Sequence, residues 1–124
     1  DDDSARKNII ELNLRMAQPD KALSELENYI NHLESQNKGE LAITFLEELV
    51  KDHDDQPLLK RTLAAQLHQM GRTSEAVPLL DVLGEILVER GDREGAIDVI
   101  NQIVLMNPHN VEDYRQLLKQ LRGG

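Results

Sequence analysis

The chain repeats itself with a shift of 54 residues, and no other feature constrains its fold as strongly. Over most of the length, this shift places apolar residues on apolar residues and alanine on alanine. The matched pairs include Ala22 with Ala76, Leu26 with Leu80, Leu33 with Leu87, Ala42 with Ala96, Arg61 with Arg115, Leu63 with Leu117 and Leu67 with Leu121. Repeats of this kind bury their apolar faces by stacking on neighbouring copies, so the sequence predicts an array of similar units.

The apolar spacing inside each copy is helical. Leu80, Leu83 and Leu87 recur at intervals of three and four, which places them on one face of a helix. Gly84 stands beside this stripe, and a residue without a side chain lets a neighbouring helix come close. A helix with an apolar stripe and a gap of this kind is expected to pack tightly on the next one.

The ends of the helices are also marked. Gly91 suits the left-handed conformation that closes a helix, and Asp92 suits the cap that opens the next one. Ala76 and Ala96 are the small residues of their helices, and we expect both to be buried where neighbouring helices approach most closely.

These signals predict seven helices. Asp1–Asp3 reads as a solvated acidic tail, and the pair Asn37 and Glu40 reads as a capping box that opens the third helix. Asn110 is expected to cap the last helix. The first helix is expected at about 4–17, the second is opened by Pro19, and the third is capped by Asn37. The fourth is opened by Pro57 and closed by Gly71, and the others are expected at about 73–90, at 92–106 and after Asn110. The residues expected on the buried side of the third helix are Leu41, Ala42, Phe45, Leu46, Leu49 and Val50.

The stretch Gly71–Pro108 resembles the tetratricopeptide repeat (TPR) family. It contains Leu80-x2-Leu83-Gly84-x2-Leu87, then Ala96-x3-Ile100, then Pro108, and the TPR pattern has a similar order of residues over 34 positions. The chain departs from the family because its unit has three helices and not two. The resemblance implies an all-α, right-handed superhelix of about seven antiparallel helices, and the family's usual role implies binding of another protein.

Composition narrows the classes of function. The chain has 14 basic and 23 acidic residues, a net charge of −9, no cysteine, no tryptophan and one phenylalanine. This argues against nucleic acid as a partner and against disulfides or cysteine-based zinc sites. Because no apolar run is long enough to cross a membrane and no signal peptide is recognisable, we expect no membrane partner and a cytoplasmic location.

A catalytic or metal site is not expected. The run Asp52-His53-Asp54-Asp55 offers possible metal ligands, but it lacks the spacing of a calcium loop and reads better as a turn between helices. Neither a nucleophile beside a histidine nor a glycine-rich phosphate loop is present in the sequence. We therefore predict a protein that is not an enzyme and that has no cofactor.

The prediction is a single TPR-like domain spanning residues 1–124, with units of about 4–56 and 57–108 and a terminal helix at 110–121, cut from a longer protein. It would bind a peptide, a helix or a domain of its own parent chain. The alternative is a structural spacer that self-associates weakly through terminal helices, because adjacent Ile9 and Ile10, and Leu117 and Leu118, give both ends wide apolar surfaces. The candidate partner-binding residues are Arg61, His68, Arg115 and Lys119. In some TPR domains such residues clamp carboxylates, although here Ala65 and Lys119 stand where an asparagine would be needed.

Overall fold

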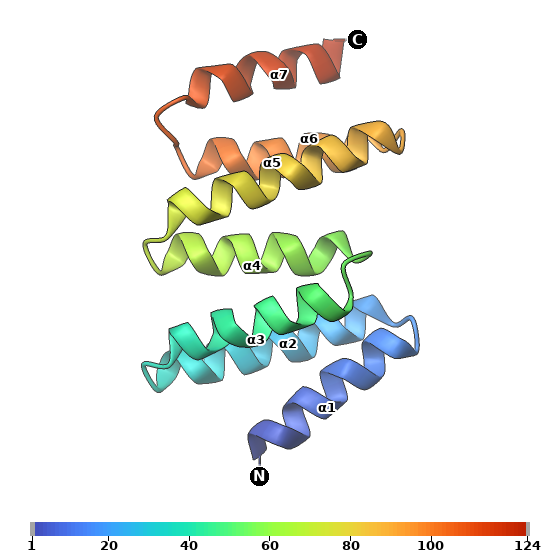
Figure 1. The fold of residues 1–124 in the computed structure, drawn as a ribbon, viewed down its shortest axis with the longest axis vertical. Coiled ribbons are helices and arrows are strands. Elements are labelled where there is room, and N and C mark those ends of the chain that lie inside the picture. Colours follow the sequence, from blue (N-terminus) through green and yellow to red (C-terminus); the bar gives the residue numbers. More distant parts are fainter. Residues whose placement is uncertain (1, 124) are drawn as a thin grey trace. The chain divides into compact units, whose positions relative to one another are not determined.

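The protein is all-α. The computed structural model describes residues 2–123, the side chains from Asp3 onward, and within this range it contains seven helices and no strand. They are α1 (Asp2–Arg15), α2 (Pro19–Ser35), α3 (Gly39–Asp52), α4 (Pro57–Gln69), α5 (Thr73–Glu89), α6 (Arg93–Leu105) and α7 (Val111–Gly123) (Figure 1). The all-α class and the seven helices predicted from the sequence are confirmed. None of these helices is long and apolar enough to cross a membrane.

The helices belong to two compact units, and the boundary between them lies inside α3. The first unit ends at Thr44 and the second begins at Phe45. In the first unit, α1 packs against α2. Its buried apolar residues are Ile10, Leu14, Ala22, Leu26, Tyr29, Ile30, Leu33, Ala42 and Ile43.

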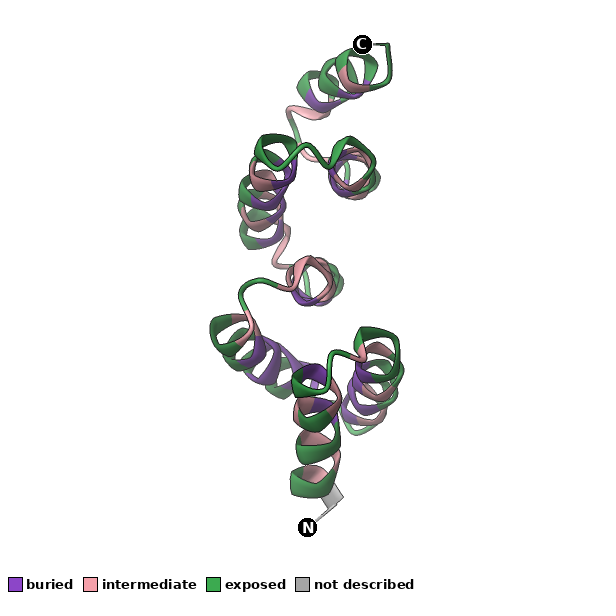
Figure 2. Ribbon diagram, turned by 90° about the vertical axis from the view of Figure 1, so that its right-hand side faces the viewer, coloured by how far each residue is buried: buried purple, intermediate pink, exposed green. Residues whose placement is uncertain are grey.

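In the second unit, each helix from α4 onward packs against the next. Side chains also join helices that are two apart. The Arg61 side chain of α4 bonds to Gln102 of α6, and the Tyr114 hydroxyl of α7 donates to Asp81 of α5. In Figure 2, α4 and α6 accordingly lie on one side and α5 on the other. Apolar side chains fill the space between them, and those buried include Leu59, Leu63, Leu67, Leu80, Leu83, Leu87, Val99, Ile100 and Ile103.

Small residues of α5 and α6 are buried. Ala76 and Ala96 are both fully buried, as predicted. Gly84 of α5 lies against α6, because a Cβ atom at this position would stand 3.3 Å from Cδ1 of Ile100. The glycine therefore removes a side chain at a helix contact, which is the role expected from its place beside the leucine stripe.

Four links between helices have one backbone geometry. In the links 16–18, 36–38, 70–72 and 90–92, the middle residue has a positive φ, with values of 55° at Ala17, 59° at Asn37 and 80° at both Gly71 and Gly91. The amide that follows donates to a carbonyl five residues back in every case, as from Asp92 to Leu87 at 2.8 Å. This bond and the left-handed residue are the signature of a Schellman motif.

The same four links reproduce the 54-residue shift. Ala17 corresponds to Gly71 and Asn37 to Gly91. A buried alanine follows each left-handed residue five positions later, and its amide donates to the carbonyl of the residue before the helix; these alanines are Ala22, Ala42, Ala76 and Ala96. The self-similarity of the sequence is therefore also a self-similarity of backbone conformation.

Two expectations about helix starts differ from the structure. The capping box at Asn37 is wrong, because Asn37 is the left-handed residue that closes α2 and so cannot take the extended conformation of an N-cap. The carbonyl of Lys38 accepts the first amides of α3. The prediction of an acidic tail at Asp1–Asp3 is also wrong in part, because α1 already begins at Asp2. Aspartates are favourable at a helix N-terminus. Asp1 lies outside the described residues. Asp92 does cap α6, since its carboxylate accepts from the amide of Gly95 at 2.9 Å.

The buried side of α3 is narrower than expected at one edge. Leu41 is 54% exposed and Ile43 is buried in its place. Residues are about 100° apart around a helix, so Leu41 lies about 40° beyond Phe45, just past one edge of the arc that runs through Ala42, Phe45 and Leu46. Val50 is half-buried at the other edge of this arc.

Candidate functional site

The four predicted partner-binding residues occupy three places. Arg61 is in the middle of α4, His68 is near its end, and Arg115 and Lys119 are one turn apart on α7. The structure therefore brings Arg115 and Lys119 together and leaves the other two in separate surroundings.

Arg61 is engaged by the fold itself. Its Nε donates to Oε1 of Gln102 at 2.9 Å, and Nε2 of Gln102 donates back to the Arg61 carbonyl at 3.0 Å. This reciprocal pair holds the half-buried Arg61 side chain between α4 and α6. One guanidinium edge is used in this way, so a partner could meet only the outer nitrogens.

His68 is an exposed residue that connects α4 to the start of α5. Its Nδ1 lies 2.7 Å from the hydroxyl of Thr73. The contact spans the left-handed link at Gly71, so it holds two consecutive helices across a tight turn.

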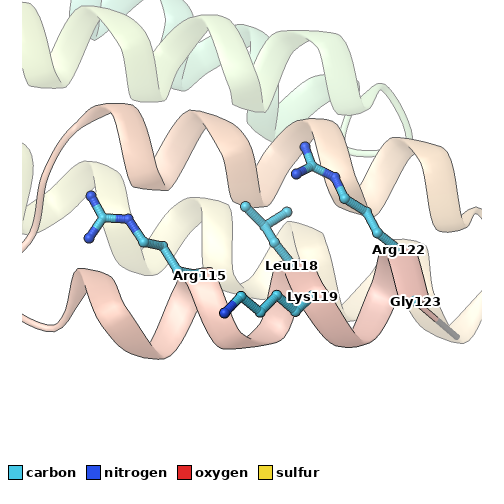
Figure 3. Close-up of a pocket in the computed structure, with 5 residues that line it drawn as sticks. All are labelled: Arg115, Leu118, Lys119, Arg122 and Gly123. Carbon is cyan, nitrogen blue, oxygen red and sulfur yellow. The ribbon is translucent and has the colours of Figure 1, made fainter.

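A row of cations runs along one side of α7. Arg115, Lys119 and Arg122 are four and three residues apart, so their side chains lie on one face of the helix. The sequence analysis missed Arg122, although its spacing from Lys119 was available as a signal. Together with Leu118 and Gly123, these residues line a surface hollow of about 470 Å³ (Figure 3). Figure 3 shows Leu118 between the two arginines, and this leucine is almost entirely buried.

This basic row stands out because the chain as a whole is acidic. Arg115 forms an ion pair with Glu112, one turn earlier on α7. Arg122 reaches Asn101 of α6 with a long contact of 3.4 Å between Nη2 and Oδ1. Lys119 is exposed and forms no ion pair with any residue from 2 to 123. The row can therefore accept carboxylates, and Lys119 is its most available cation.

A second polar contact lies on another side of α7. The Tyr114 hydroxyl donates to Oδ2 of Asp81 at 2.8 Å. Burial, and then the carboxylate that accepts this bond, raise the pKa of Tyr114 above its ordinary value. The neutral phenol is therefore the form that the fold favours.

The run from Asp52 to Asp55, interpreted from the sequence as a turn and not as a metal site, spans the end of α3 and the link to α4. Among residues 2–123, His, Asp and Glu side chains do not gather in groups of three or more that could hold a metal ion. Asp52 is the last residue of α3, and His53, Asp54 and Asp55 lie in the turn that follows it.

Comparison of the chain with protein-family models, with curated proteins and with solved structures gives no match in any of the three.

Proposed function

We propose that this protein is a non-catalytic helical scaffold that binds a segment of another protein, or of another domain of its own parent chain. The observation that carries the proposal is the row of Arg115, Lys119 and Arg122 around Leu118 on α7. A row of cations suits an acidic segment, whose carboxylates are complementary to it in charge. No cofactor or metal is part of this function.

The architecture proposed for the scaffold is a TPR-like, right-handed superhelix built from a three-helix unit. Its support is local. Within the second unit, consecutive helices pack together and side chains bridge α4 to α6 and α5 to α7. The recurring links and their buried alanines supply the regularity that a repeat array needs. We also propose that the scaffold is located in the cytoplasm.

Binding at the basic row should be weak and sensitive to salt. An exposed ion pair contributes only about 0.2–1 kcal/mol, so several contacts are needed together. The net charge of −9 repels acidic peptides from the rest of the surface, which confines them to α7.

The test is fluorescence anisotropy with a short labelled peptide in which glutamate pairs alternate with leucine. The double variant Lys119→Glu and Arg122→Glu should abolish binding. The matched control is Arg90→Glu and Arg93→Glu, which changes net charge equally at exposed positions around the start of α6. Equal loss in both variants, or no binding by the parent protein, would refute the basic row as the site.

The alternative is self-association through the terminal helices. Apolar surface is exposed on both, since Ile9 is 45% exposed and Leu117 is 37% exposed. Light scattering over a concentration series at low and high salt tests this, because salt screens the repulsion between copies. A mass that stays constant under all conditions would exclude this alternative.

A further inference from the structure

An apolar groove lies between α5 and α7, away from the basic row. Its volume is about 420 Å³. Apolar lining comes from three helices: Gly84 and Val88 of α5, Ile100 of α6, and Leu117 and Leu121 of α7.

The floor of the groove is closed and its sides are exposed. Gly84 has no side chain, and Cδ1 of Ile100 would lie 3.3 Å from a Cβ atom placed there, so α6 fills the space beneath. Val88 is 50% exposed on one side, and Leu117 is the exposed leucine of α7 on the other. A partner's apolar side chain could therefore bury surface against both of them.

One wall of the groove is acidic. Asp81, Glu85 and Glu89 follow one another at intervals of four along α5, and all three line the groove. Asp81 accepts the hydrogen bond of Tyr114. Glu85 and Glu89 are exposed, and neither forms an ion pair with any residue from 2 to 123. These two carboxylates are available for cations from outside.

The groove and the basic row lie on different sides of α7. Leu117 is two positions from both Arg115 and Lys119, and two positions correspond to about 200° around a helix. A cationic ligand in the groove therefore keeps the thickness of α7 between itself and these side chains.

The internal repeat indicates what kind of surface this is. Leu63 and Leu67 of α4 correspond to Leu117 and Leu121, and they are buried, with exposures of 5% and 4%. They lie on a helix against which α5 packs. The corresponding leucines of α7 are less covered, so this side of α7 suits an additional helix.

Two of the three carboxylates in the acidic wall are particular to the second copy of the repeat, whereas the third, Asp81, corresponds to the acidic residue Glu27. Under the 54-residue shift, Glu85 and Glu89 correspond to Asn31 and Ser35. The two carboxylates therefore do not belong to the shared features of the repeat, and the selectivity that they give is local to this groove.

We propose that the groove between α5 and α7 binds a basic amphipathic helix of another protein. Apolar residues three and four apart on that helix would lie on Val88 and Leu117, and lysine or arginine beside them would pair with Glu85 and Glu89. A helix satisfies its own backbone hydrogen bonds, whereas an extended segment would need backbone partners that these helix faces do not offer.

The test uses a labelled peptide with leucine at helical spacing and lysine at its other positions, and a matched peptide with glutamate in place of lysine. The lysine peptide should bind and become helical in circular dichroism. Any binding of the glutamate peptide should be lost in the double variant Lys119→Glu and Arg122→Glu, because that peptide would occupy the basic row and not the groove. The double variant Glu85→Gln and Glu89→Gln should weaken binding of the lysine peptide about fivefold. Leu117→Asp should abolish it.

The control is Glu47→Gln and Glu48→Gln, which removes two exposed carboxylates from α3. Equal weakening by this control would show a diffuse attraction to an acidic protein and would overturn the proposal. Unchanged binding of the lysine peptide to the Leu117→Asp variant would also overturn the proposal. A doubled mass that Leu117→Asp abolishes would show that a second copy of the chain occupies the groove, which would overturn it as well. The charge reversal at Lys119 and Arg122 should leave this binding intact, so the groove and the basic row are tested independently.

Discussion

Tyr114 of α7 and Asp81 of α5 are joined by a hydrogen bond of 2.8 Å, although the whole of α6 lies between them in the chain. The bond fixes two helices that are not consecutive. It also lies beside the proposed groove, since Asp81 lines it.

Tyr114→Phe should lower the free energy of unfolding by about 1–2 kcal/mol, because a hydrogen bond to a charged acceptor is lost. The effect should depend on pH. The pKa of Tyr114 is raised in the folded protein, so its contribution is complete below the ordinary tyrosine pKa of about 10 and is lost as the pH rises through the folded value. Urea denaturation from neutral to alkaline pH should show a steeper loss of stability for the parent than for the variant. Parallel curves would contradict the assignment.

Ala17→Gly should stabilise the protein by about 0.5–1 kcal/mol. Ala17 has a φ of 55°, a conformation that costs a residue with a Cβ atom about 1–2 kcal/mol and costs glycine little. Gly71→Ala at the corresponding link is the matched control, and it should destabilise by about 1 kcal/mol. A Cβ atom at Gly71 would meet nothing within 4 Å, so only the backbone strain is tested. Thermal melts that showed the same sign for both changes would contradict this account.

Gln66→Leu should also stabilise the protein. Gln66 is 4% exposed on α4, and its Nε2 has no hydrogen-bond partner in the part of the chain that the structure describes. A buried donor without a partner costs about 1–3 kcal/mol, and leucine removes it while keeping apolar volume. Gln120→Leu at the corresponding exposed position of α7 serves as the control and should stay within about 0.5 kcal/mol of the parent. A lower melting temperature for Gln66→Leu would mean that the amide has a bound partner in solution.

Ala96→Leu should destabilise the protein by about 1–3 kcal/mol, because the larger side chain overpacks a fully buried position at a helix contact. Circular-dichroism melts give the measurement. Ala65→Leu provides a matched change on an exposed face of α4 and should have little effect. Equal melting temperatures for Ala96→Leu and the parent would show that the contact has room to spare.

Much of the fold follows from local spacing. The intervals between Leu80, Leu83 and Leu87 define a face whatever it packs against, and all three are buried. Gly91 and Asp92 form their hydrogen bonds with residues three to five positions away, so their roles at the link could be predicted from the local sequence. The role of Asn37 was predicted wrongly because asparagine is common both as the cap that opens a helix and as the left-handed residue that closes one. Only the length of the link shows which of the two roles it has.

The candidate site depends on longer distances. Arg61 and Arg115 coincide in the repeat, yet one bonds to Gln102 and the other to Glu112. Apolar spacing says which face a helix can bury, but not how many neighbours cover it, so the exposure of Leu117 needs the structure. Spacing within α5 places Asp81, Glu85 and Glu89 in one row, but only the structure shows that this row lines a groove together with leucines of α7.

The short links determine how the chain can change its length. An extra residue at 16–18, 36–38, 70–72 or 90–92 would displace the left-handed residue and turn the following apolar stripe by about 100°. The links at 53–56 and 106–110 are longer, and neither has the bond to a carbonyl five residues back, although Asn107 has a positive φ of 52°. Insertions should therefore be tolerated only in the links 53–56 and 106–110. A shorter or longer relative of this protein should differ from it by a whole block of three helices, removed or added between these two links.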